Sequence, residues 1–179
     1  MFAAMRRDGA DERQETVAAL VFLAPLFAVL STPRFATLLD EPEVSGASVA
    51  VFAFIAAVAY AFVGYVLLGG ALKLGSGAPY RLARHVVAYA CAPLALGLLF
   101  LWPVRLAAYG SDLFRAGGSD AGTGGTVFAL ADLGLALWAL GLLVCGARYA
   151  LELPWPRAAA ACVLPATLAG LAVWLDRFQ

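Results

Sequence analysis

Long apolar runs dominate the pattern of hydrophobic and polar positions along the chain. Each run has the length of a membrane span, and only the fourth contains a charge well inside it, Asp132. The hydrocarbon core of a bilayer is about 30 Å thick and needs about 20 mostly apolar helical residues to cross it. Short alternating strands, which would indicate a barrel, are missing from the pattern. The pattern therefore predicts five transmembrane helices, over residues 17–33, 48–70, 85–105, 127–148 and 158–175.

Composition supports an all-α integral membrane protein. Of the 179 residues, 63% are hydrophobic and only 13% are charged, whereas soluble domains carry about 25% charged residues. The net charge is zero, so the chain lacks the basic field that a nucleic-acid-binding protein needs. We expect one membrane domain over residues 17–179, preceded by a short cytoplasmic leader, 1–16. Eleven of the twelve basic residues are Arg, which indicates a GC-rich, bacterial genome.

The first apolar run is expected to be a retained helix. Its leader contains several acidic residues, unlike the basic start of a signal peptide, and no small-residue cleavage site follows the run. Basic residues also favour one orientation, because cytoplasmic loops are enriched in them. Eight lie on the side of the N-terminus: Arg6, Arg7, Arg13, Lys73, Arg81, Arg84, Arg148 and Arg157. Four lie on the other side: Arg34, Arg105, Arg115 and Arg177. The prediction is an N-terminus inside and a C-terminus outside.

Asp132 is the candidate residue for proton or cation transport. A charge at mid-membrane costs at least about 2.5–3.5 kcal/mol, so it needs a partner or water. One interpretation is a proton or cation relay. The other, which we favour, is structural: a helix that begins near Phe128 would place Asp132 in its first turns, close to the outer interface. Arg105, at the outer end of the third span, is then the expected partner in an intramembrane polar pair.

The cytoplasmic turn between the second and third spans is the best candidate surface for a partner or for lipid. Loops held on a rigid scaffold commonly carry binding, and basic residues attract anionic headgroups. The candidate residues are Lys73, Gly75, Gly77, Tyr80, Arg81, Arg84 and His85. His85 is the sole histidine and has no second metal ligand at helical spacing. No catalytic constellation, metal site or cofactor site is indicated.

Small residues and prolines shape the spans. Ala53, Ala57 and Ala61 recur every four residues, which lets helices approach closely in lipid. Packing inside the bundle is the default interpretation, and a dimer face is the alternative. Prolines interrupt three spans, and each removes a backbone donor and should kink its helix: Pro25, Pro93 and Pro165.

One stretch resembles the Yip family, the five-span membrane proteins named for interacting with Ypt/Rab GTPases. It reads Leu74-Gly75-Ser76-Gly77, then Tyr80-Arg81, then Tyr89 and Pro93. The closing segment is also similar, through Leu137-Trp138-Ala139-Leu140, Gly146, Arg148, Arg157 and Pro165. The resemblance covers residues 17–175. It implies a non-enzymatic role in membranes, in which members bind GTPases or sister members, or influence membrane shape. The long cytoplasmic N-terminal region of eukaryotic members is reduced here to a short leader, so GTPase binding is not carried over.

Two classes of function remain from the sequence. The first is a scaffold or accessory subunit of the cell membrane that associates with lipids, with other membrane proteins or with copies of itself. The alternative is a small transporter or channel with Asp132 on the pathway. A pathway residue would face a wet cavity, whereas a structural residue would be paired.

Overall fold

The chain folds into helices joined by short connections. The computed structural model describes residues 14–32, 45–114 and 122–176, which contain no strand. The predicted leader therefore lies mostly outside the described residues, as do Arg34, Arg115 and Arg177. The elements are α1 (Gln14–Leu30), α2 (Gly46–Ser76), α3 (Tyr80–Ala90), α4 (Ala92–Leu96), the π-helix η2 (Gly97–Leu101), α5 (Trp102–Tyr109), the 3-10 helix η3 (Gly110–Phe114), α6 (Thr123–Tyr149) and α7 (Trp155–Asp176).

The surface of the bundle is that of a membrane protein. Large apolar side chains are widely exposed; Phe62, for example, is 72% exposed. Among the described residues no polar or charged side chain is buried. Three helices are long and apolar enough to cross a bilayer: α2, α6 and the composite Tyr80–Phe114. Together with the shorter α1 and with α7, they form the predicted all-α membrane bundle, and the fold class is confirmed.

The third span is a broken helix. It is interrupted at Cys91, and Pro93 lies in the first turn of the next helical segment, α4. A π-helix follows, in which the N–H of Trp102 donates to the carbonyl of Gly97. Pro103, which has no N–H, directly follows Trp102. The sequence anticipates the break at Pro93, whereas Pro25 and Pro165 lie inside α1 and α7, which continue past them.

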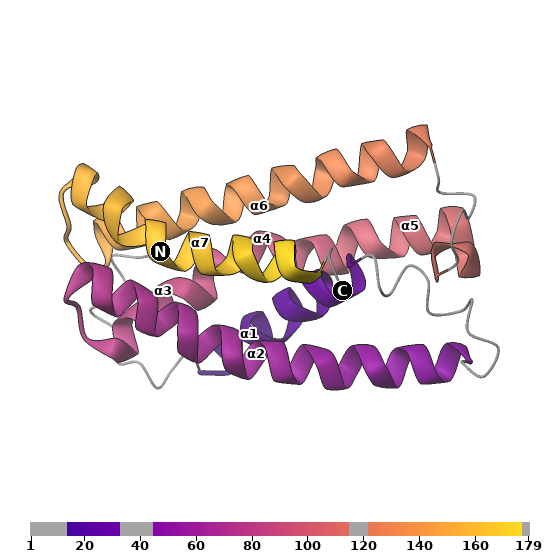
Figure 1. Cartoon of the computed structure of the whole chain (residues 1–179), viewed down its shortest axis with the longest axis horizontal. Coiled ribbons are helices and arrows are strands. Elements are labelled where there is room, and N and C mark those ends of the chain that lie inside the picture. The colour runs from indigo at the N-terminus through magenta and orange to yellow at the C-terminus, as the bar shows by residue number, and fades with distance from the viewer. Residues whose placement is uncertain (1–13, 33–44, 115–121, 177–179) are drawn as a thin grey trace.

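The helices pack most closely at one end, which we call the Gly77 end because the α2–α3 turn lies there (Figure 1). Successive spans run in opposite directions, with α3 to α5 forming one span (Figure 1), and α2 contacts α1, α3 and α7. The densest core joins α2, α3, α6 and α7 at this end. Its buried members are Leu72, Ala83, Val86, Val87, Ala90, Leu143, Ala147, Ala150, Ala158, Ala161 and Cys162.

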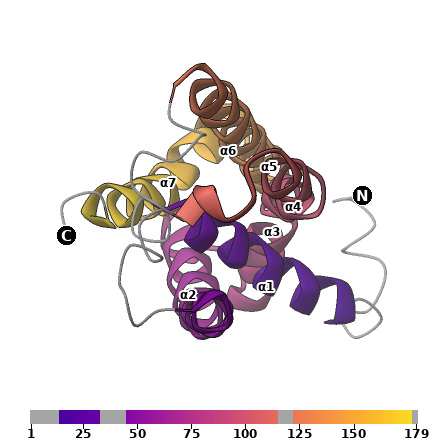
Figure 2. The same ribbon diagram turned by 90° about the vertical axis from the view of Figure 1, so that its right-hand side faces the viewer.

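At the opposite end, the Gly110 end, the helices diverge. There α6 and α2 lie along opposite edges of the molecule, as Figures 1 and 2 show. A smaller apolar cluster at this end contains Phe27, Trp102 and Leu113, with Leu135 of α6 packed against it. The half of α6 nearer the Gly110 end has few contacts with the rest of the bundle.

Small residues allow the close helix contacts. Ala53, Ala57 and Ala61 are buried inside the bundle, as the packing interpretation of this stripe expects. A Cβ atom added at Gly75 would lie 2.8 Å from the carbonyl oxygen of Ala161, so α2 and α7 meet there backbone to backbone. At Gly69 an added Cβ would overlap the side chain of Arg84 in α3.

Helix boundaries differ from the predicted spans where glycine or polar residues continue a helix. The clearest case is α6, which begins at Thr123 rather than at residue 127. Its first turn contains Gly124, and a Cβ there would overlap the hydroxyl of Tyr109, so the glycine allows close contact with α5. Asp132 consequently lies nine residues into the helix, about 14 Å along its axis. The expected stabilisation by the first-turn dipole does not reach this far.

Candidate functional site

A rigid turn connects α2 to α3 at the Gly77 end. Gly77 adopts a left-handed conformation, with φ of 70°, and its N–H donates to the carbonyl of Lys73 at 2.8 Å. Such a cap strongly favours glycine. The Ser76 hydroxyl donates to the carbonyl of Leu72 at 2.6 Å and accepts from the N–H of Ala78 at 3.2 Å. These hydrogen bonds fix the direction in which α3 leaves the turn.

Two tyrosines hold the guanidinium of Arg84 between the helices. Its central carbon lies 4.6 Å from the ring centre of Tyr80 and 5.1 Å from that of Tyr65. The Tyr80 hydroxyl donates to the carbonyl of Val66 in α2, at 3.1 Å. Because Gly69 has no side chain, Arg84 can lie directly against α2. Arg84 therefore braces the α2–α3 pair, and its guanidinium is only partly available to an outside partner.

The other predicted surface residues have unequal roles. Lys73 and Arg81 are exposed, and His85 is half-buried. Lys73 Nζ lies 6.0 Å from the ring centre of Tyr80, so its charge stays close to the turn. Gly75 serves the contact between α2 and α7 described above, which is a packing role.

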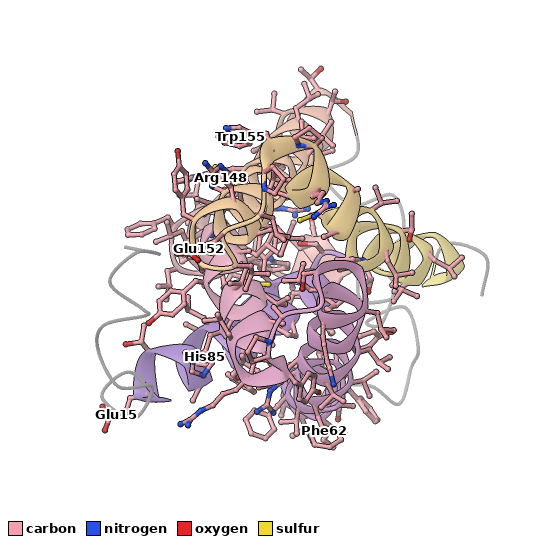
Figure 3. The ribbon with its side chains drawn as sticks, turned by 90° about the vertical axis from the view of Figure 1, so that its left-hand side faces the viewer. Glu15, Phe62, His85, Arg148, Glu152 and Trp155 are labelled. Atoms are coloured by element: carbon pink, nitrogen blue, oxygen red, sulfur yellow. The ribbon has the colours of Figure 1, made fainter. Side chains whose placement is uncertain are left out.

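Further basic and aromatic residues lie at the same end of the molecule. The turn between α6 and α7 brings Tyr149 and Trp155 edge to face, with ring centres 6.1 Å apart. The Arg148 guanidinium lies 5.6 Å from the ring centre of Tyr149. Figure 3 shows His85, Arg148 and Trp155 at this end. The Gly77 end thus carries the α2–α3 turn and the α6–α7 turn, each of which has basic residues beside it.

The two residues of the family pattern inside the third span are buried. Tyr89 is 6% exposed and packs with Ala88, Val17 of α1 and Tyr65 of α2. Pro93 is fully buried at the start of α4. Both positions shape the junction of the first three spans.

The structure brings the candidate polar pair together within the membrane. Arg105 Nη1 of α5 lies 3.5 Å from Asp132 Oδ2 of α6. The Arg105 guanidinium also lies 5.3 Å from the ring centre of Trp102 and 5.2 Å from that of Phe128. Cation–π contacts of this kind strengthen when water is excluded. Asp132 is therefore neutralised by a cation that aromatic rings hold in place.

The turn and the polar pair do not form one site. Arg84 and Arg105 are 21 residues apart on the third span, which corresponds to about 30 Å of helix. Within the described part of the chain, no group of three histidine, cysteine or acidic residues lies close enough together to hold a metal ion.

Sequence patterns alone do not identify the aromatic partners of the two arginines. Tyr65 and Phe128 come from other spans than the arginines that they contact. Trp102, three residues before Arg105 on the same helical face, was predictable as a neighbour. An aromatic residue at i−3 or i−4 from an arginine within a span was the available signal, and Tyr80, four residues before Arg84, repeats it.

The Yip1 domain model matches residues 2–175, almost the whole chain. The protein belongs to the Yip1 family. Membership agrees with the resemblance carried by the turn, Tyr89 and Pro93, and with the multi-pass membrane fold. No curated protein and no solved structure shows a significant match to the chain.

Proposed function

We propose that this Yip1 family member is a non-enzymatic scaffold or accessory subunit of the cytoplasmic membrane. It associates with membrane lipids and with other membrane proteins through the basic surface at the Gly77 end. The observation that carries the proposal is the braced α2–α3 turn, in which Arg84 and its two tyrosines hold Lys73 and Arg81 on a rigid support. Each basic residue near an anionic surface contributes about 1 kcal/mol of attraction.

The polar pair supports the same class of function over transport. A relay residue needs a wet path, whereas Asp132 is paired with Arg105 at 3.5 Å. The neighbouring groove between the third span and α6 is lined by apolar residues. A transporter with Asp132 on its pathway is the alternative, and the π-helix beside the groove is the observation in its favour, since π-helices often mark functional sites.

Affinity purification from native membranes tests the proposal. The tagged full chain is compared with the double variant Lys73→Gln, Arg81→Gln, and co-purifying lipids and proteins are measured by mass spectrometry. Asp112→Asn is the control, because it removes a charge at the opposite end. We expect the double variant to lose anionic lipids and partner proteins while its thermal unfolding is unchanged. Identical co-purifying material would refute the proposed surface.

A flux measurement tests the alternative. Purified protein in liposomes is assayed for proton and cation uptake, and Asp132→Asn is compared with the unmodified chain. Flux that disappears in the variant would favour the transporter and overturn the scaffold proposal. We expect no flux above that of protein-free liposomes.

A further inference from the structure

A third exposed cation lies beside the α2–α3 turn, and it comes from α7. The last turn of α2 meets the second turn of α7, since a Cβ atom added at Gly75 would lie 2.8 Å from the carbonyl oxygen of Ala161. Arg157 precedes Ala161 by four residues, so it lies on the same face of α7 and about 6 Å nearer the Gly77 end. The side chain of Arg157 is exposed, as are those of Lys73 and Arg81. Packing of α7 against α2 therefore adds Arg157 to the basic residues of the turn.

The charges of the two turns at this end are strongly unbalanced. Residues 73–85 contain three Lys or Arg residues, and residues 148–157 contain two. The same two segments contain one acidic residue, Glu152, which Figure 3 shows at this end of the molecule. An anionic partner is the one that these charges fit.

Exposed apolar and aromatic side chains lie among these cations. Leu74, the neighbour of Lys73, is 78% exposed, and Tyr149 and Trp155 are 54% and 52% exposed. Aromatic rings of this kind gather at the headgroup level of a bilayer, and Lys and Arg side chains extend from apolar surface toward the same level. The combination is typical of a membrane interface.

Both turns are too short to carry their cations far from the membrane. Three residues, 77–79, join α2 to α3, and five residues, 150–154, join α6 to α7. The exposed basic side chains therefore stay close to the ends of membrane-length helices. Headgroups of the protein's own membrane lie within their reach, whereas a cytosolic protein would find little projecting surface to hold.

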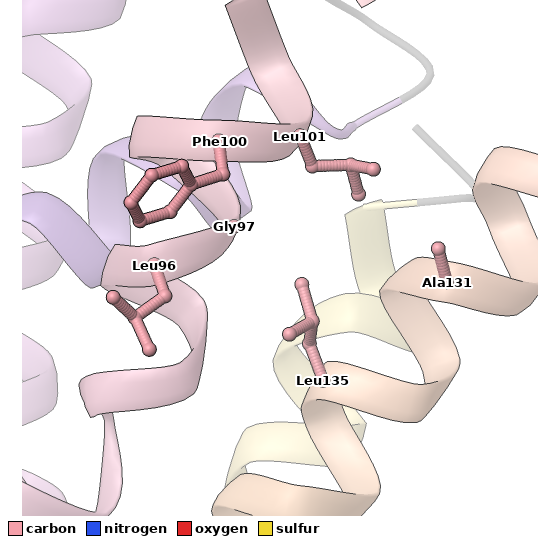
Figure 4. Close-up of a pocket in the computed structure, with 6 residues that line it drawn as sticks. All are labelled: Leu96, Gly97, Phe100, Leu101, Ala131 and Leu135. Carbon is pink, nitrogen blue, oxygen red and sulfur yellow. The ribbon is translucent and has the colours of Figure 1, made fainter. Parts of the chain in front are cut away.

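The groove between the third span and α6 does not offer such a match (Figure 4). It is lined by Leu96, Gly97, Phe100, Leu101, Ala131 and Leu135, none of which is charged. The nearby charges of Arg105 and Asp132 already pair with each other at 3.5 Å. Selection of a lipid by its headgroup charge therefore belongs to the Gly77 end.

We propose that the partner of this surface is the anionic phospholipid of the protein's own cytoplasmic leaflet, and that Lys73, Arg81 and Arg157 together contact its phosphates. The inference rests on the function proposed above and narrows it to one class of partner. The ammonium and guanidinium groups donate to phosphate oxygens in charge-assisted hydrogen bonds. Tyr149 and Trp155 lie at the depth of the headgroups and hold the α6–α7 turn at that level.

Native mass spectrometry of the purified full chain tests the proposal with defined lipids and no other protein. The chain is exchanged into micelles that contain equal amounts of phosphatidylglycerol and phosphatidylethanolamine, and we expect phosphatidylglycerol to be retained preferentially. Arg157→Gln should lower the ratio of retained phosphatidylglycerol to phosphatidylethanolamine about fivefold, equivalent to about 1 kcal/mol. Arg157→Lys keeps the charge and should preserve the ratio. Arg177→Gln is the matched control, because Arg177 follows the far end of α7, and it should also preserve the ratio.

Two results in micelles would overturn the proposal. One is equal retention of the two lipids by the unmodified chain, a comparison that does not depend on the folding of any variant. The other is the same loss for Arg157→Gln and Arg177→Gln. If the lipid preference is missing while the variant Lys73→Gln, Arg81→Gln still loses proteins from native membranes, the surface binds protein. The scaffold function would then stand without this inference.

A vesicle assay separates the protein's own membrane from another one. The full chain is held in nanodiscs of phosphatidylcholine and mixed with vesicles of phosphatidylglycerol, and flotation measures binding. We expect no binding above that of empty nanodiscs, because the short turns keep the cations at the level of their own headgroups. Flotation with the vesicles would place the partner on a second membrane and overturn the assignment.

Discussion

Two adjacent glycines in α2 give a sharp test of how the α2–α3 pair is held together. An added Cβ at Gly69 would lie 3.2 Å from Arg84 Cα and would overlap Arg84 Cγ, whereas at Gly70 nothing lies within 4 Å. Both replacements by alanine gain about 1 kcal/mol of helix propensity. Overpacking at Gly69 costs about 1–3 kcal/mol, because α3 must move or Arg84 must leave its tyrosines. The propensity term cancels in the comparison, so Gly69→Ala should be about 1–3 kcal/mol less stable than Gly70→Ala.

Thermal unfolding with a thiol-reactive dye measures this difference in detergent. Cys162 is 2% exposed, so it reacts when the core opens. A difference of 1 kcal/mol shifts Tm by about 2–4 °C in a protein of this size. We therefore expect Gly69→Ala to melt at least a few degrees below Gly70→Ala, with Gly70→Ala at or above the unmodified chain. Equal melting temperatures would refute the close α2–α3 contact.

Three further predictions address the polar pair, the turn and the topology. Arg105→Gln and Asp132→Asn should each lower the free energy of unfolding. The loss in the double variant should be about 1 kcal/mol smaller than the sum of the two single losses, because the side chains are in contact and only 16% and 24% exposed. Additive losses in the same dye assay would contradict the pairing. Tyr80→Phe removes the hydrogen bond to the Val66 carbonyl and should cost about 0.5–1.5 kcal/mol, and an unchanged Tm would show that bond to be dispensable. Reporter fusions at Arg13 and Gln179 should report inside and outside respectively, and a cytoplasmic signal at Gln179 would rule out the five-span topology.

The sequence was sufficient to identify a multi-pass membrane protein and to indicate its family. Apolar runs of membrane length are a local property of the chain, because each transmembrane helix satisfies its own backbone hydrogen bonds. The pattern of Gly77, Tyr80 and Pro93 carried the family resemblance, and the Yip1 domain match confirms it. The expected partnership of Arg105 with Asp132 followed from helix direction, since both residues fall toward the same end of adjacent spans.

The depth of Asp132 and the surroundings of both arginines were decided by tertiary structure. Helix α6 begins at Thr123, and Gly124 in its first turn packs against Tyr109 of another helix, a contact that no local pattern reveals. Tyr65 reaches Arg84, and Phe128 reaches Arg105, only when separate spans are packed together. Helix propensity and hydropathy depend on near neighbours in sequence. The aromatic surroundings of Arg84 and Arg105 depend instead on which helix faces meet. Those faces are set by the packing of the whole bundle.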